Sequence, residues 1–438
     1  MKKRIFSVLL GIMLLSQSVL SACGTREAHS DNVVPDGNLL NNSKIEVFNA
    51  ETTVTISGWL EDVYTQNLLA YLAEKNPEYT FEYRYIGKNS YETIVDAELA
   101  SRQASDIVMV NPVMAFRHGK NGYIEDLSEL CGDFDEEAQN AFSFEGKIYA
   151  IPSTSEYQCI FYNRDIVEKY GHTVPIQFND FLNYCDEVRA DIGIRPVACG
   201  IKDTDKLADN ALAFLEANYF STEQGKDFGE RVARGEAAFG KELQPYLYQW
   251  KELVNHKIFT REMCIMDSEA AIDEFASGKA LMYMGVVEDY NRIVEKNPSM
   301  RVGTTGVPGA VKGTTILIGG CDSGFAVNSF GKKKDVATEI VAELATKEGQ
   351  RALWRDRIGS QTYFKDVEFD NPPVFDGLRP TISAHRVFMP VSEWGEHGTQ
   401  IYGILGRELQ KVVSGERNID VAVQVMDFEI EQIQKNKR

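Results

Sequence analysis

The alternation of strand and helix patterns between residues 52 and 112 constrains the fold more than any other feature of this sequence. Short apolar or alternating runs with turn signals around them predict strands, and apolar residues at helical spacing predict helices. The predicted elements in order are a strand at 52–57, a helix ending near 76, a half-buried strand at 80–86, a helix over about 91–103 and a buried strand at 106–110. Such a βαβα order predicts an α/β fold with a mostly parallel sheet and helices on both of its faces.

The rest of the chain is richer in helical patterns. Helices are predicted over 178–190, 209–220, 243–254, 268–277 and 336–354, with two more near the C-terminus separated by Gly415. Strands are predicted at 279–284 and 301–303, the glycine-rich stretch 303–309 is interpreted as a turn, and the acidic run 133–137 as a solvated helix start. A chain of 438 residues favours at least two domains.

The N-terminus has the pattern of a bacterial secretory signal. Basic residues at 2–4 precede a mostly apolar run from Ile5 to Leu20, which is shorter than the roughly 20 residues of a membrane span. The tetrapeptide that ends at Cys23 resembles a lipobox, so residues 1–22 are predicted to be a signal peptide and Cys23 the lipidation site. The alternative is an ordinary cleaved signal with a chance cysteine. The polar segment 23–50 is then a flexible tether at the extracellular face of the cell membrane.

Charge and cysteine content exclude several classes of function. The net charge is −19, and it becomes −22 once the three basic residues of the signal are removed. An acidic surface argues against binding to nucleic acid or to anionic lipid. Six further cysteines form no CxxC motif and have no nearby histidine pair, so no metal is expected. They are either disulfide-bonded or buried free thiols, and apolar neighbours favour free thiols.

Catalytic and cofactor motifs are missing from the sequence. It contains no GxSxG, HExxH, Walker or GxGxxG pattern, and no pair of carboxylates stands out as a glycosidase acid and nucleophile. No cofactor and no enzymatic activity are therefore expected. A surface glycan hydrolase and a structural adhesin are retained only as remote alternatives.

A set of short phrases occurs in a fixed order along the chain. They are Gly122-Tyr-Ile-Glu-Asp-Leu-Ser128, Gly146-Lys-Ile-Tyr-Ala-Ile-Pro152, Phe161-Tyr-Asn-Arg-Asp165, Phe275-Ala-Ser-Gly-Lys-Ala-Leu-Met282, Val307-Pro-Gly309, Gly319-Gly-Cys-Asp-Ser-Gly-Phe-Ala-Val-Asn328 and Ser414-Gly-Glu416. In order and spacing they resemble the family 1 extracellular solute-binding proteins of ABC importers. The resemblance covers about residues 52–436.

This resemblance implies two α/β lobes of the periplasmic-binding-protein-like (type II) fold, joined by hinge segments around a ligand cleft. The chain is expected to cross between lobes near 157–161, near 320–325 and once within 365–385. Lobe 1 is then 51–156 plus 322–368, and lobe 2 is 160–320 plus 372–438. The implied partners are a small-molecule solute, ABC permease subunits and the membrane through the lipid on Cys23, and the protein is expected to be a monomer.

Candidate ligand-binding residues come from two sources. Ligands in α/β folds lie beyond the carboxyl ends of strands, which nominates Trp59, Glu61 and Asn111. The resemblance nominates Glu156 at the first crossing, Asp322 at the second and Trp394 as a stacking platform in lobe 2. Core packing is the alternative for Trp59, hinge packing is the alternative for Tyr157 beside Glu156, and turn capping is the alternative for Asp322.

The solute class is suggested by the same residues. Aromatic faces pack on sugar rings and carboxylates bind hydroxyls, so a mono- or oligosaccharide is expected. Relatives often have a stacking Trp after the strand at 279–284, whereas this chain has Val287 there. Either Tyr290 substitutes for it, or the solute is a peptide, polyamine or other organic molecule. Trp250 and Trp354 lie on apolar helix faces and are predicted to be core.

Overall fold

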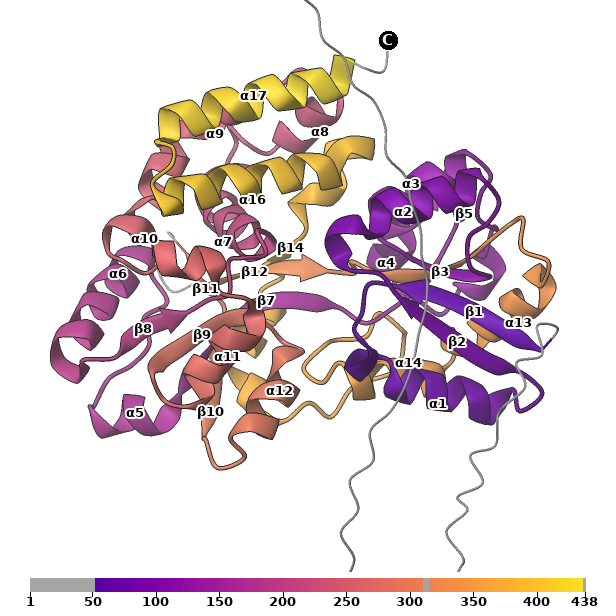
Figure 1. The fold of residues 1–438 in the computed structure, drawn as a ribbon, viewed down its shortest axis with the longest axis horizontal. Coiled ribbons are helices and arrows are strands. Elements are labelled where there is room, and N and C mark those ends of the chain that lie inside the picture. Colours follow the sequence, from indigo (N-terminus) through magenta and orange to yellow (C-terminus); the bar gives the residue numbers. More distant parts are fainter. Residues whose placement is uncertain (1–51, 310–314, 436–438) are drawn as a thin grey trace, which may run out of the picture. The chain divides into compact units, whose positions relative to one another are not determined.

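The computed structural model describes residues 52–309 and 315–435. These residues belong to one compact unit in which two lobes each surround their own β-sheet (Figure 1). The predicted signal peptide, the tether and Cys23 lie outside the described residues. Among the helices that are described, none combines the length and the apolar character that crossing a membrane requires.

Lobe 1 is built on a five-stranded sheet in the order β2-β1-β3-β13-β6. Its strands are β1 (Thr53–Gly58), β2 (Thr80–Tyr85), β3 (Ile107–Val110), β6 (Ile151–Pro152) and β13 (Gly324–Val327). The first three pair in parallel, as their sequence pattern predicts, and their three predicted positions are confirmed to within a residue or two. The strand β13 is antiparallel to both of its neighbours, β3 and β6.

Helices cover both faces of this sheet. In Figure 1, α1 and α14 lie on one face, and α2 and α3 lie on the other. The helices of lobe 1 are α1 (Gln66–Lys75), α2 (Lys88–Ala100), α3 (Pro112–Lys120), α4 (Glu136–Ala141), α13 (Lys334–Leu344) and α14 (Lys347–Asp356), and a short hairpin joins β4 (Ser143–Phe144) to β5 (Lys147–Ile148). The acidic run at 133–137 is confirmed as a helix start, because the Asp135 carboxylate accepts a hydrogen bond from the Ala138 N–H at the beginning of α4.

Lobe 2 is built on a larger, mixed sheet. Its strands follow the order β11-β12-β7-β9-β8, with β10 also paired to β7 and β14 to β12. Their bounds are β7 (Glu156–Asn163), β8 (Arg195–Ala198), β9 (Ala280–Val286), β10 (Val302–Thr305), β11 (Val307–Pro308), β12 (Thr315–Gly320) and β14 (Val387–Phe388). The central strand β7 pairs antiparallel to β9, β10 and β12, whereas β8 pairs parallel to β9 and β14 parallel to β12, so this sheet is mixed. The predicted turn at 303–309 is wrong, because that segment forms parts of β10 and β11.

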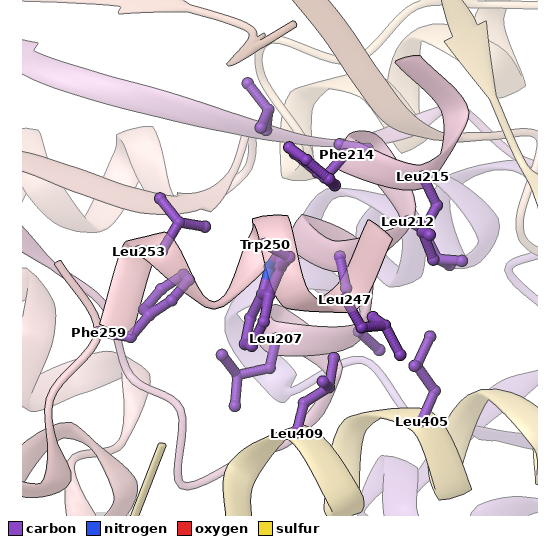
Figure 2. Packing of buried hydrophobic residues seen from close by; sticks show 14 of the residues in the cluster. Leu207, Leu212, Phe214, Leu215, Leu247, Trp250, Leu253, Phe259, Leu405 and Leu409 are labelled. Carbon is purple, nitrogen blue, oxygen red and sulfur yellow. The ribbon is translucent and has the colours of Figure 1, made fainter. Parts of the chain in front are cut away.

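Helices supply most of lobe 2. They are α5 (Arg164–Lys169), α6 (Phe178–Glu187), α7 (Asp205–Leu215), α8 (Phe228–Ala233), α9 (Phe239–Trp250), α10 (Glu252–Asn255), α11 (Ser268–Ala276), α12 (Asp289–Lys296), α15 (Arg379–Ser383), the 3-10 segment η7 (Pro390–His397), α16 (Gly398–Ser414) and α17 (Ile419–Lys435). Trp250 is at the centre of their core, packed among leucine and phenylalanine side chains from α7, α9 and α16 (Figure 2). Its exposed fraction is 0%, which confirms the prediction that it is a core residue.

Two short connections carry the chain from one sheet to the other. The chain leaves the first sheet after Pro152 and enters the second at Glu156, and it returns between Gly320 and Gly324. Gly319, in β12, pairs with Tyr157 at the start of β7. These connections lie close to two of the predicted crossings, but whether they act as hinges remains a prediction.

Replacing Gly319 with Ala is expected to destabilise the protein by about 2–4 kcal/mol through backbone strain and overpacking. The φ angle of Gly319 is +137°, and a Cβ atom built there would lie 1.8 Å from the carbonyl oxygen of Glu156. Gly415 is a matched control, since its φ of +81° is also left-handed but a Cβ atom there meets nothing within 4 Å. Urea unfolding of both variants should show a clearly larger loss for Gly319→Ala, and equal losses would contradict this prediction.

Candidate functional site

A cavity of about 510 Å³ lies between the two lobes. Both lobes line it, lobe 1 mainly through the loop after β1 and the helices α2 and α3, and lobe 2 mainly through α7, α16 and the start of η7. Its lining includes Trp59, Lys88, Tyr91, Glu92, Asp96, Asn111, Met114, Glu156, Gln158, Asp205, Asp209, Ile318, Asp322, Met389, Gln400, Tyr402 and Arg407. Because this volume is in the range of small-molecule sites, the cavity is the candidate functional site.

Several of the lining residues lie just after the carboxyl end of a strand, where ligands of α/β folds are expected to bind. Trp59 follows β1 directly, and its ring packs edge-on against Tyr91 with the centroids 5.0 Å apart. The Tyr91 hydroxyl is within hydrogen-bond distance of the carbonyl oxygens of Ser57 (2.9 Å) and Met109 (2.8 Å), so it ties together the ends of β1 and β3. Asn111 follows β3, and its amide oxygen caps α3 by accepting the Met114 N–H at 2.8 Å. The indole of Trp59 is thus held by groups that belong to the framework of lobe 1.

A buried arginine organises the acidic side chains at the junction of the lobes. Arg357 follows α14 in lobe 1, yet its guanidinium donates to Glu288 of lobe 2 at 2.7 Å. Its side chain is only 2% exposed, and it also lies 3.4 Å from the Glu156 carboxylate and 3.9 Å from that of Asp322. Burial raises the pKa of Glu288 to about 7 and that of Asp322 to about 6, although Arg357 acts in the opposite direction on both.

Glu156 behaves differently from its two acidic neighbours. Burial disfavours its charge, but the positive charges of Lys88 and Arg357 outweigh burial and lower the pKa of its carboxyl. The Lys88 ammonium lies 3.9 Å from the Glu156 carboxylate. Glu156 therefore stays ionised at neutral pH and can accept hydrogen bonds from a ligand in the cavity.

A second acidic group lies on α7. Tyr402 of α16 donates a hydrogen bond from its hydroxyl to the Asp209 carboxylate at 2.7 Å and to the Asp205 carbonyl oxygen at 3.1 Å. Burial raises the pKa of Asp209 to about 7. The sequence patterns do not identify these residues as part of a site, because they predict a helix that begins at Asp209, whereas α7 begins at Asp205. The signal that could have identified them is Thr204-Asp205, a helix start that places Asp205 and Asp209 on one face.

A charged contact also joins the lobes beside α2 and α3. The Arg117 guanidinium pairs with Glu92 at 2.6 Å and with Asp96 at 2.5 Å, and it donates to the Glu396 carbonyl oxygen in η7 at 3.0 Å. The carboxylates of Glu92 and Asp96 on the lobe 1 wall are thereby neutralised. Across residues 52–309 and 315–435, no cluster of three or more His, Cys, Asp or Glu side chains is arranged to hold a metal ion.

The structure brings together four of the seven residues predicted to bind ligand. Trp59, Asn111, Glu156 and Asp322 all line the cavity. Their direct contact with a ligand remains a proposal. Among the described residues, the rest of the cavity wall comes largely from helices. The expectation that ligands lie beyond the carboxyl ends of strands does not predict helical residues.

Glu61, Tyr157 and Trp394 lie outside this lining. Glu61 is exposed and faces Arg292 at 3.4 Å, and Tyr157 is buried in β7. Trp394 is 2% exposed and packs edge-on against Phe239 in the lobe 2 core, with the ring centroids 5.1 Å apart. In this structure it is a core residue and not a platform in the cavity, because the turn of η7 directs the chain over α8.

The region after β9 also has a packing role. Val287 is fully buried, and Tyr290 packs edge-on against Phe375 at 5.3 Å, so neither residue lines the cavity. Trp354 is half-buried, stacks on Phe369 and donates its indole N–H to Asn371 at 2.8 Å. Trp59 is accordingly the one tryptophan among the lining residues.

Comparison with known proteins agrees with this architecture. A model of the bacterial extracellular solute-binding proteins matches residues 67–372. The multiple sugar-binding protein of Streptococcus mutans serotype c is 20% identical over 371 residues, which cover 84% of each chain.

Solved structures of similar fold include a chain from a study of xylan utilization by Caldanaerobius polysaccharolyticus (TM-score 0.73, 18% identity, 86% of this chain and 100% of that one). Another is a sugar transporter from Bacillus licheniformis in complex with stachyose (TM-score 0.72, 16% identity, 86% and 98%). At these identities the structures establish the two-lobed fold, and the family model covers more than half of the sequence. The chain belongs to the bacterial extracellular solute-binding protein family.

Proposed function

We propose that this chain is the lipid-anchored substrate-binding component of an ABC importer, and that its solute is a mono- or oligosaccharide. The observation that carries the proposal is the cavity between the lobes, whose lining includes the aromatic side chain of Trp59, the carboxylates of Glu156 and Asp322 and the amide of Asn111. An aromatic face suits the apolar C–H surface of a sugar ring, and the carboxylates suit its hydroxyls. The relatives that are named for sugars support the same assignment.

The proposed mechanism is binding without covalent chemistry. The solute enters the cavity, the lobes close on it about the connections near residues 153–155 and 321–323, and the closed form is presented to the permease. Bound solute stabilises the native state by RT ln(1 + [L]/Kd), which is about 2.7 kcal/mol at 100 Kd. Thermal unfolding against an oligosaccharide panel, with X-ray scattering for closure, tests this. An unchanged melting temperature with every sugar would contradict it.

Replacing Trp59 with Ala should weaken sugar binding by at least about 2 kcal/mol, or roughly 30-fold in Kd, because the substitution removes the stacking face. Stability should change little, since Trp59 is only partly buried. Trp354→Ala is the matched control, because this tryptophan stacks on Phe369 away from the cavity and should alter stability without altering affinity. Calorimetric titration and denaturant unfolding of both variants distinguish these roles, and unchanged affinity in Trp59→Ala would remove it from the site.

The lipid anchor has its own test. Replacing Cys23 with Ser should abolish acylation and either leave the precursor unprocessed or release the protein into the medium, because the lipid attaches to the cysteine sulfur. Metabolic labelling with a fatty acid measures this directly. A wild-type protein that carries no label would contradict the anchor while leaving the solute-binding proposal untouched.

A further inference from the structure

Lys88 lines the cavity from a position like those of Trp59 and Asn111. Trp59 follows β1, Asn111 follows β3, and Lys88 comes shortly after β2, at the start of α2. Because β2, β1 and β3 are neighbours in the lobe 1 sheet and run parallel, their carboxyl ends meet at one edge of that sheet. The Lys88 side chain is 51% exposed, so its ammonium group is accessible to a solute in the cavity.

The ammonium group of Lys88 faces a carboxylate without reaching it. Its Nζ atom lies 3.9 Å from the Oε1 atom of Glu156, which is longer than a hydrogen bond. The other carboxylate oxygen of Glu156, Oε2, lies 3.4 Å from the Arg357 guanidinium. Within the described ranges, neither Lys88 Nζ nor Glu156 Oε1 takes part in a hydrogen bond. The Glu156 side chain is 21% exposed, so a donor and an acceptor stand side by side and open to a ligand.

Lys88 remains protonated at neutral pH. The Glu156 carboxylate raises the pKa of Lys88 against the effect of burial, and the carboxylates of Asp205, Asp209 and Asp322 act in the same direction. These four carboxylates also line the cavity. Lys88 therefore places one positive charge of lobe 1 opposite an otherwise acidic part of the cavity.

This arrangement favours a neutral ligand group over a charged one. A carboxylate of the solute would meet Glu156 and Asp322, and an ammonium group would meet Lys88, so each would face a like charge. Two neighbouring hydroxyl groups avoid both conflicts, because one can donate its O–H to Glu156 while the oxygen of the other accepts an N–H of Lys88. Hydrogen bonds in which one partner is ionised are about twice as strong as those between neutral groups.

We propose that Lys88 and Glu156 together bind a vicinal diol of an uncharged sugar, and that Lys88 is a specificity-determining residue of the cavity. This inference rests on the proposed function, since it takes the cavity as the sugar site, and it narrows the solute to neutral sugars with two adjacent free hydroxyl groups. A solute without such a diol leaves the ammonium or the carboxylate without a hydrogen-bond partner, which lowers its affinity.

The test begins with neutral trisaccharides. Calorimetric titration of the full-length protein with maltotriose, cellotriose, xylotriose and raffinose identifies the sugar that binds best. Lys88→Met should weaken the binding of that sugar at least tenfold, because methionine is of similar length but has no donor. Lys226→Met is the matched control, since Lys226 is exposed, pairs with Glu223 at 2.6 Å and does not line the cavity, and it should leave the affinity unchanged. Thermal unfolding of each variant verifies that it is folded.

Two further measurements distinguish a shared diol from a general effect of charge. Glu156→Gln combined with Lys88→Met should lose less affinity than the sum of the two single losses, because both residues hold the same pair of hydroxyl groups. Trigalacturonate, spermidine and a trialanine peptide with blocked ends present carboxylates, amines and amides. Each should bind at least tenfold more weakly than the best neutral sugar.

The outcomes separate this inference from the proposed function. Unchanged sugar affinity in Lys88→Met, or additive losses in the double variant, overturns the inference and leaves sugar binding intact. Preference for trigalacturonate overturns the neutral diol but keeps a carbohydrate as the solute. Binding of spermidine or of the blocked peptide, without binding of any sugar, overturns both the inference and the carbohydrate proposal.

Discussion

Replacing Arg357 with Met is expected to lower the free energy of unfolding by about 3–5 kcal/mol at pH 7, because removing one partner of a buried ion pair leaves an uncompensated charge. Arg357 is the buried cation that Glu288 contacts, and it also donates to the Thr154 carbonyl oxygen at 3.2 Å. Without it, the carboxylates of Glu156, Glu288 and Asp322 are left close to one another at the junction between the two sheets. Urea unfolding of the variant beside wild type measures the loss.

The free energy of unfolding that Arg357→Met loses should be smaller at low pH than at neutral pH. Burial raises the pKa of Glu288 to about 7 even with Arg357 present, so the folded protein binds this proton more tightly than the unfolded chain does. The contribution of Glu288 to the free energy of unfolding therefore increases as the pH falls from about 7 towards the ordinary value of a glutamate. In Arg357→Met, protonation also removes the uncompensated charge, so the variant should lose less stability at pH 5 than at pH 7.

Two further variants make this result interpretable. Arg379 forms an exposed pair with Asp376, and Arg379→Met should change stability by less than about 1 kcal/mol. Adding Glu288→Gln to Arg357→Met should restore part of the lost stability, because the charge left behind is removed. A loss that is the same at both pH values and is not relieved by Glu288→Gln would show that packing of the Arg357 side chain, and not its charge, provides the stabilisation.

Replacing Trp250 with Ala should cost about 3–5 kcal/mol, since it removes one of the two tryptophan side chains of the lobe 2 core and leaves a cavity behind (Figure 2). The indole N–H donates to the Asn210 side-chain oxygen at 2.8 Å, and this buried acceptor would lose its donor. Denaturant unfolding and calorimetric titration on the same samples separate stability from binding. Trp59→Ala is the counterpart that should lose affinity instead.

Trp394→Ala extends the same comparison to a residue that was expected to contact ligand. Its position against Phe239 predicts that it behaves like Trp250 and mainly lowers stability. If Trp394→Ala abolishes ligand binding while the free energy of unfolding is unchanged, the result would contradict the assignment of Trp394 to the lobe 2 core and would place it in the binding site.

Local sequence patterns predicted the strands better than the helix ends. The runs at 52–57, 80–86 and 106–110 appear as β1, β2 and β3, because each is apolar or alternating and has turn residues on both sides. The single helix predicted over 336–354 is in fact α13 and α14. Its apolar spacing continues through the break, but the Thr346 hydroxyl accepts the Gly349 N–H at 3.0 Å and begins a new helix. Periodicity does not report such a cap.

The residues of the candidate site also differ in whether their positions could be predicted from the sequence. Trp59 and Asn111 could be located because a strand end lies immediately before each of them in sequence. Arg357 could not, since its partner Glu288 is distant in the chain and neither lies in a recognisable motif. Trp394 shows the opposite difficulty: an aromatic residue near a cleft and an aromatic residue in a core have the same sequence signature, and only the tertiary packing distinguishes them.

The position of β13 within the lobe 1 sheet has a consequence for the order in which the protein can assemble. This strand, residues 324–327, lies between β3 and β6, although both neighbours are complete by residue 152. During synthesis, β3 therefore keeps an unpaired edge until most of the polypeptide has been made. Contacts so distant in sequence slow folding, and an open strand edge can pair with other chains. Incomplete chains ending before Gly324 should thus be prone to aggregation, and lobe 1 cannot finish folding before lobe 2 is largely synthesised.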